Sequence, residues 1–149
     1  MRMRLVMLML VSACASPMSL PNLSVTTTLS TSEIRAGEPV VVTVVARNAG
    51  DKTVRINSSP CTPLFVVMTQ DGAVVGPAEH FCALSLMTRD LAPGESFTFV
   101  GQWTGDAQSG GIITSPPSML GPGTYTLRGQ VLSDVGFIKS ESVAIRIIL

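Results

Sequence analysis

Few side chains in this sequence have the types and spacing that chemistry requires. The chain contains one histidine, His80, and three cysteines, Cys14, Cys61 and Cys82, while its acidic residues are dispersed. A hydrolase needs a nucleophile beside a base, or tuned carboxylates, and a metal site needs several Cys or His ligands. No such set assembles, and no glycine-rich phosphate loop ends in Lys-Ser/Thr. We therefore expect no enzymatic activity, catalytic residue, metal site, cofactor or small-molecule substrate.

Cys14 follows a segment typical of an export signal. The charged start MRMR precedes the apolar run 5–11, LVMLMLV, and the small residues Ser12 and Ala13 come directly before Cys14. This order is that of a signal peptide, and the run is far shorter than the roughly 20 apolar residues of a membrane-spanning helix. We predict that the protein is exported.

The four residues V-S-A-C at 11–14 resemble the lipobox of bacterial lipoproteins, whose cysteine is lipidated and becomes the first residue after cleavage. The resemblance implies a lipid anchor on Cys14. The alternative is an ordinary A-x-A cleavage site at 13–15, which would remove Cys14 with the signal. Ala15 is not the Asp that retains enteric-type lipoproteins at the inner membrane, so the resemblance favours the outer membrane or the cell surface.

The remaining cysteines, Cys61 and Cys82, form an even pair in an oxidising compartment. We predict a disulfide between them, which would close a loop of about 22 residues and stabilise the fold by roughly 3 kcal/mol. A redox couple or metal site is the alternative, but the spacing is not C-x-x-C and only His80 is nearby. We interpret His80 as a loop residue.

Length and charge limit the class of protein. The 149 residues suit one domain, and Lys plus Arg and Asp plus Glu each number 10. Nucleic-acid binding would require a basic patch or stripe, which this sequence lacks. We expect a protein partner, and a membrane only through the lipid anchor.

The elements that position these residues are short strands separated by Gly/Pro turns. Alternation of apolar and polar residues predicts an all-β fold, an immunoglobulin-like antiparallel sandwich of about seven to eight strands. We also predict a hairpin from Val40 to Ile56, a second turn at QDG, and mostly connection between Gly76 and Ser96. The expected strands are 23–29, 40–48, 53–56, 64–69, 96–103, 124–132 and 142–149.

Two aromatic residues are expected to be structural. Trp103 shares one face of its predicted strand with Phe97 and Phe99, although it follows both cysteines, unlike the core Trp of antibody domains. Tyr125 begins a strand after GPG, as in a tyrosine corner, where the hydroxyl bonds back to nearby backbone. A ligand contact is the alternative role for Tyr125.

The segment 105–120, GDAQSGGIITSPPSML, is a long connection between two strong strands. Connections of this length are usually functional or disordered. Its apolar residues are too many for a solvated linker, so we predict that it packs on the sandwich or forms a binding loop. The candidate binding residues are Ile112, Ile113, Met119 and Leu120.

The order of several motifs resembles the BsuPI-type proteinase inhibitor domain. The matching segments are the strand ending at Asn48, the AGDKTVRI that follows, FVVMTQDGAVV at 65–75, LAPGES at 91–96, Trp103 followed by Gly105, and GPGTYTLRG at 121–129. Asp71-Gly72 departs from the family, because no tryptophan follows this turn. The resemblance implies an immunoglobulin-like fold and a protease as partner.

These observations predict a signal peptide at 1–13, a tether at 14–22 and a sandwich domain at 23–149. The leading hypothesis is a lipid-anchored protein of the cell envelope that binds another protein, with proteinase inhibition as the function implied by the resemblance. The alternatives are a structural spacer or assembly subunit without a binding loop, and a small-ligand carrier, for which the sequence shows no polar pocket.

The lipid anchor leads to a first prediction. Replacing Cys14 with Ser should abolish incorporation of labelled palmitate and release the protein from the membrane fraction, because the thiol is the acceptor of the lipid. The measurement is autoradiography of fractionated cells, with Cys61→Ser as the control that keeps its label. Palmitate incorporation that survives Cys14→Ser would show that the anchor is elsewhere.

Overall fold

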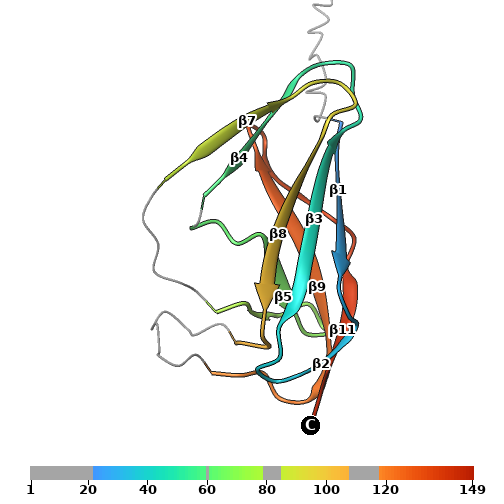
Figure 1. The fold of residues 1–149 in the computed structure, drawn as a ribbon, viewed down its shortest axis with the longest axis vertical. Coiled ribbons are helices and arrows are strands. Elements are labelled where there is room, and N and C mark those ends of the chain that lie inside the picture. Colours follow the sequence, from blue (N-terminus) through green and yellow to red (C-terminus); the bar gives the residue numbers. More distant parts are fainter. Residues whose placement is uncertain (1–21, 60, 79–84, 108–117) are drawn as a thin grey trace, which may run out of the picture.

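A computed structural model describes residues 22–59, 61–78, 85–107 and 118–149, and these residues form eleven strands and no helix. The strands make a three-stranded and an eight-stranded sheet that pack face to face (Figure 1). The predicted all-β sandwich is therefore confirmed. The additional strands are short elements of three to five residues that carry no clear alternation of their own.

The smaller sheet contains the strands that the sequence predicted best. In the order β1-β3-β8, the central strand pairs antiparallel with both neighbours. Alternation places every second side chain of the central strand in the core, and Val40, Val42, Val44 and Ala46 are fully buried, as predicted. The three strands are β1 (Leu23–Leu29), β3 (Val40–Asn48) and β8 (Ser96–Trp103).

The larger sheet is built around its longest strand, β9. The first half of β9 pairs with β11 and β5, and the second half pairs with β10 and β4. At the margins, β2 pairs with β11, β6 with β5, and β7 with β4. The members of this sheet are β2 (Glu33–Arg35), β4 (Val54–Ser58), β5 (Phe65–Met68), β6 (Val74–Gly76), β7 (Met87–Leu91), β9 (Gly123–Ser133), β10 (Gly136–Lys139) and β11 (Val143–Ile148).

One expectation about connectivity is wrong. The predicted hairpin from Val40 to Ile56 does not form, because β4 leaves the smaller sheet and pairs with β7 and β9 of the larger one. The region from Gly76 to Ser96, predicted to be mostly connection, also contains β7. The predicted turn at QDG does join a hairpin, β5–β6.

A polar seam joins the two sheets on the β1 side. The backbone N–H of Gly129 on β9 lies 3.2 Å from the Thr27 hydroxyl and 3.1 Å from the Ser140 hydroxyl. These two hydroxyls are 2.8 Å apart, and Ser140 also donates to the Glu141 carbonyl. Because a buried N–H needs an acceptor, this arrangement satisfies the backbone of β9 while it ties β1 to the larger sheet.

The predicted signal peptide and tether lie outside the described residues, apart from Asn22. Within the described ranges, no helix has the length and apolar character needed to cross a membrane.

The seam predicts a steep cost for any side chain at position 129. A Cβ on Gly129 would lie 2.2 Å from the Thr27 Oγ1 and 2.8 Å from a Val44 methyl group. Gly129→Ala should therefore lower the free energy of unfolding by about 1 to 3 kcal/mol, the range for overpacked cores, as measured by urea denaturation. Gly121→Ala is the matched control, because its Cβ would meet open space. Equal stability of the two variants would contradict the close approach.

Candidate binding site along strand β8

The two sheets end at different places on the β8 side. Among the described residues β8 is the last strand of the smaller sheet, whereas β4 and β7 of the larger sheet continue past it (Figure 1). Three hollows of about 220, 160 and 590 Å³ follow one another along this side. We call them together the β8 groove. Its lining includes Ile56, Asn57, Ser58, Met87 and Arg89 at the first hollow, Leu64, Phe99, Val100 and Gln130 at the second, and Pro63, Val74, Pro77, Gly101, Gln102 and Asp106 at the third.

Aromatic side chains form one end of the groove. Phe97 and Phe99 lie on the inward face of β8, yet both are only partly buried, and β8 is the last strand of the smaller sheet among the described residues. Their rings meet edge to face with centroids 4.8 Å apart. The Arg89 guanidinium lies 4.6 Å from the centre of the Phe97 ring, a cation–π distance. This end is therefore apolar with one cation above it.

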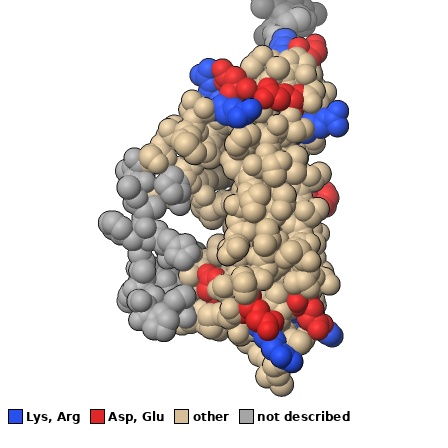
Figure 2. All heavy atoms as spheres, viewed as in Figure 1, with Lys and Arg blue, Asp and Glu red and all other residues tan. Residues whose placement is uncertain are grey.

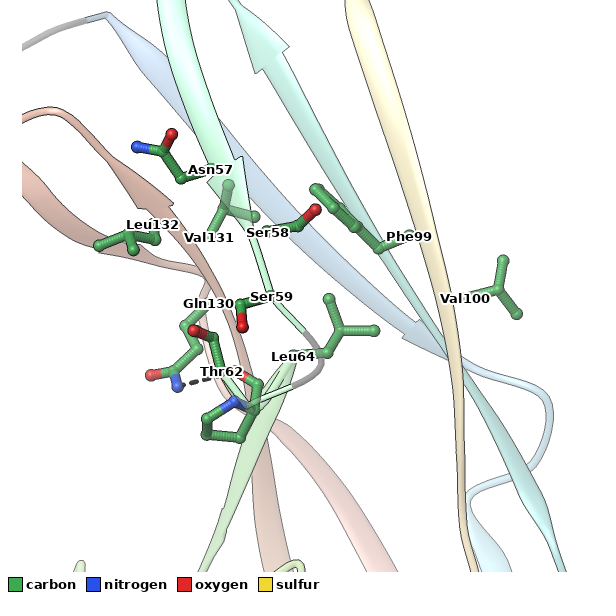
Figure 3. Close-up of a pocket in the computed structure, with 11 residues that line it drawn as sticks. Asn57, Ser58, Ser59, Thr62, Leu64, Phe99, Val100, Gln130, Val131 and Leu132 are labelled. Atoms are coloured by element: carbon green, nitrogen blue, oxygen red, sulfur yellow. Dashed lines mark hydrogen bonds between the residues drawn. The ribbon is translucent and has the colours of Figure 1, made fainter. Parts of the chain in front are cut away.

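The middle of the groove separates β8 from the segment before β5 (Figure 3). Phe99 and Leu64 come from these two sides and face the hollow. A Cβ on Gly101 would lie 3.2 Å from a Leu64 methyl group, so Gly101 leaves the space that Leu64 uses. The Gln130 amide donates to the Pro63 carbonyl at 3.0 Å, and this hydrogen bond holds the segment before β5 against β9. Val100 points outward and is 67% exposed.

Asp106 fixes the other end of the groove. Its carboxylate accepts hydrogen bonds from the Ala78 N–H and from the N–H and hydroxyl of Thr104. The Trp103 indole N–H donates to the Asp106 carbonyl at 3.1 Å, and Trp103 is 1% exposed. Asp106 is therefore a structural carboxylate that joins the end of β8 to the chain after β6.

On the face shown in Figure 2, charged side chains gather at the two ends and are sparse between them. Arg55 and Asp90 form a two-pronged ion pair of 2.7 and 3.1 Å between β4 and β7. The hydrogen bond from Arg55 lowers the pKa of Asp90. At the other end Arg146 pairs with Glu33. All eight residues of β8 are uncharged, so this strand brings no charge to the groove.

Glu95 stabilises the turn into β8. Its carboxylate accepts the Ala92 N–H at 2.9 Å and a hydrogen bond from Arg89 at 3.0 Å. These two interactions, with the backbone bond the larger, lower the pKa of Glu95. The same contacts hold Arg89 over the aromatic end of the groove.

The buried polar atoms of the described residues are used within the fold. Each buried side-chain N or O atom in the described ranges already has a hydrogen-bond partner. In the same ranges no cluster of three or more His, Cys, Asp or Glu could hold a metal ion. The lining of the groove is mixed, because Ser58, Thr62 and Gln102 contribute polar side chains beside its apolar residues.

The predicted site residues fall in different places. Cys61 lines the third hollow, in the segment between β4 and β5. Cys82 lies outside the described residues, so the disulfide stays a prediction. Cys14, His80, Ile112 and Ile113 also lie outside them.

Met119 and Leu120 are described and close the base of the predicted binding loop. The Leu120 N–H donates to the Gly105 carbonyl at 2.8 Å, and the backbones of Met119 and Asp106 pair as an isolated antiparallel β-bridge. Leu120 packs against the core, while Met119 is 41% exposed. The Tyr125 hydroxyl donates to the Gly121 carbonyl at 2.8 Å, which is the geometry of a tyrosine corner.

Sequence reasoning did not find the groove residues. Phe97, Phe99 and Leu64 have the pattern of ordinary core positions. The one available signal was Val100, an aliphatic residue among the polar residues on the outward face of β8.

No family model matches this chain, and no curated protein is significantly similar to it. Several solved structures align with it at low identity. The alkylpurine DNA glycosylase AlkC of Pseudomonas fluorescens, bound to DNA containing an abasic site analog, aligns with a TM-score of 0.51 and 10% identity, over 86% of this chain and 31% of that one. The sporulation control protein Spo0M of Bacillus subtilis aligns at 0.46 and 17%, over 87% and 49%. A β-glucosidase of Listeria innocua aligns at 0.44 and 14%, over 84% and 16%.

This chain thus spans less than half the length of each of these structures. The match to AlkC supports the sandwich fold alone. The other two are too distant to support an argument.

The lowered pKa of Glu95 gives a pH-dependent prediction. A carboxyl with a lowered folded pKa contributes stability above its unfolded pKa and loses it as the pH falls through the folded pKa. Glu95→Gln should therefore melt below the wild type near pH 7, while the two should melt together at about pH 2. Thermal unfolding by circular dichroism checks this. Glu141→Gln, at an exposed position, is the control expected to match the wild type throughout.

Proposed function

We propose that this chain is an exported, lipid-anchored protein of the cell envelope whose sandwich binds another protein through the β8 groove and catalyses no reaction. The observation that supports binding is the groove itself, a channel whose described lining is largely apolar and whose charged residues, Arg89 and Asp106, are already paired. Exposed apolar side chains adjoin it: Met87 is 68%, Leu86 64% and Val100 67% exposed. Contiguous exposed apolar surface on a soluble domain marks interaction sites.

The lipid anchor on Cys14 and the tether to residue 22 belong to this proposal. They would hold the sandwich a few residues from a membrane, where a protein partner is within reach. Proteinase inhibition is the version implied by the BsuPI resemblance, and the partner would then be a protease.

The alternative function is that of a structural spacer or assembly subunit. A spacer adds bulk to an envelope complex and needs no apolar groove. The exposed residues beside β8 favour the binding function over the spacer.

Cross-linking in the native envelope tests the proposal. Met87→Ser should reduce the yield of the cross-linked partner several-fold, because it removes exposed apolar area from the groove. Phe137→Ser is the matched control, since Phe137 is 47% exposed but lies on β10 outside the groove. Equal yields from both variants would support the spacer.

Adding the purified chain at micromolar concentration to a panel of serine proteases tests the inhibitor version. That version is wrong if none of the proteases is slowed.

A further inference from the structure

We propose that β8 accepts an extended, uncharged segment of a protein partner as an additional strand, with alternate aliphatic side chains of that segment entering the β8 groove. This inference rests on the proposed function and names the chemistry of the partner. It differs from docking of a folded surface, because the main chain of β8 would supply the hydrogen bonds.

The backbone of β8 offers hydrogen-bonding groups on its open side. The Asn48 N–H donates to the Glu95 carbonyl at 2.9 Å, which sets the phase of the β3–β8 ladder. Bonded and non-bonded pairs alternate in an antiparallel ladder, so the odd-numbered residues of β8 bond to β3. The N–H and C=O groups of Thr98, Val100 and Gln102 therefore point away from β3. Within the described residues β8 pairs with β3 alone.

The residues of β8 also lack the sequence features by which edge strands avoid pairing. It has no charged residue and no proline, and its register with β3 is unbroken over the whole strand. Natural edge strands are usually short, charged, bulged or covered. The margins of the larger sheet follow that rule, because β7 contains Arg89 and Asp90, and β2 has only three residues, two of them charged.

An added strand would fill the space where the smaller sheet stops short. Neighbouring strands lie about 4.8 Å apart, so the new strand would lie between β8 and the inner faces of β4, β7 and β5. Every second side chain would then point into the hollows beside Phe97, Phe99 and Leu64. The remaining side chains would lie on the outer face beside Thr98 and Val100.

The charges of the groove favour a neutral segment. Arg89 and Asp106 are the charged residues in its described lining, and both already have partners. A charged side chain entering the hollows would lose hydration without gaining a counterion. Aliphatic or hydroxyl side chains meet no such penalty.

A second folded copy of this chain fits the edge less well than an isolated segment. Antiparallel pairing of two β8 strands would place both larger sheets on the same side of the joined smaller sheets. Each larger sheet extends past its own β8 toward the other copy, so the two would collide. A segment without its own second sheet avoids this collision.

The test uses the neutral peptide acetyl-GTVTVTVTG-amide as a probe for the full chain. We expect it to shift the NMR amide signals of Thr98, Val100 and Gln102 and to protect these amides from hydrogen exchange. Val100→Pro should weaken binding about tenfold, because it removes an outward N–H without removing a bond to β3. A peptide N-methylated at alternate residues should bind as weakly.

Two lysine substitutions, one on β8 and one on β3, provide the matched control. Val100→Lys should also weaken binding, whereas Thr43→Lys should not, since Thr43 lies opposite Val100 on the outer face of the central strand β3. Circular dichroism of each variant checks that the sandwich is folded.

Three results would overturn the inference: no binding of the neutral peptide at millimolar concentration, full binding by Val100→Pro, or a β8-dependent dimer that Val100→Lys disrupts. Loss of cross-linking in Met87→Ser together with failure of the peptide would leave the proposed function intact and remove strand addition. Peptide binding without any envelope partner would support strand addition at β8 and remove the proposed function.

Discussion

A single buried amide, that of Asn48, determines how the chain passes between its two sheets. Asn48 is fully buried at the end of β3, and its side-chain N–H₂ donates to the carbonyls of Lys52 at 2.7 Å and Leu91 at 2.9 Å. Its side-chain oxygen accepts the Gly50 N–H at 3.0 Å. Its own N–H donates to the Glu95 carbonyl, and its own carbonyl accepts the Gly94 N–H. An apolar residue here would leave several buried backbone groups unpaired.

These bonds connect two chain reversals that are distant in sequence. One carries the chain from β3 across to β4, and the other carries it from β7 back to β8. Because both depend on the same side chain, the position of β8 in the smaller sheet and the position of β7 in the larger one are coupled. The groove between these strands is a product of that coupling.

The sequence predicted the strands in which apolar and polar residues alternate. It did not predict the strands and pairings that depend on tertiary contacts. β1, β3 and β8 have the bounds expected from period-two patterning, since each has one buried face. β7 was missed because four of its five side chains are exposed, so MTRDL has no apolar face. The β3–β4 hairpin was predicted from a turn-like AGDK, but the buried bonds of Asn48 direct the chain to the other sheet.

The candidate site was less predictable than the fold. Its lining comes from segments up to some seventy positions apart, such as Asn57 and Gln130, and each residue has an ordinary local pattern. A groove that results from unequal sheet widths has no local signature, because width depends on how many strands each sheet recruits. The predicted binding loop drew attention to Met119 and Leu120, which pair with the chain just beyond the end of β8.

The hydrogen-bonded seam at Gly129 has a mechanical consequence. The sheets are joined by Thr27 and Ser140 on one side and separated by hollows on the other. A rotation of one sheet against the other about this seam would have to break the hydrogen bond from the Ala78 N–H to Asp106 on the β8 side. The sandwich is therefore held on both sides, by the seam beside β1 and by Asp106 at the end of β8.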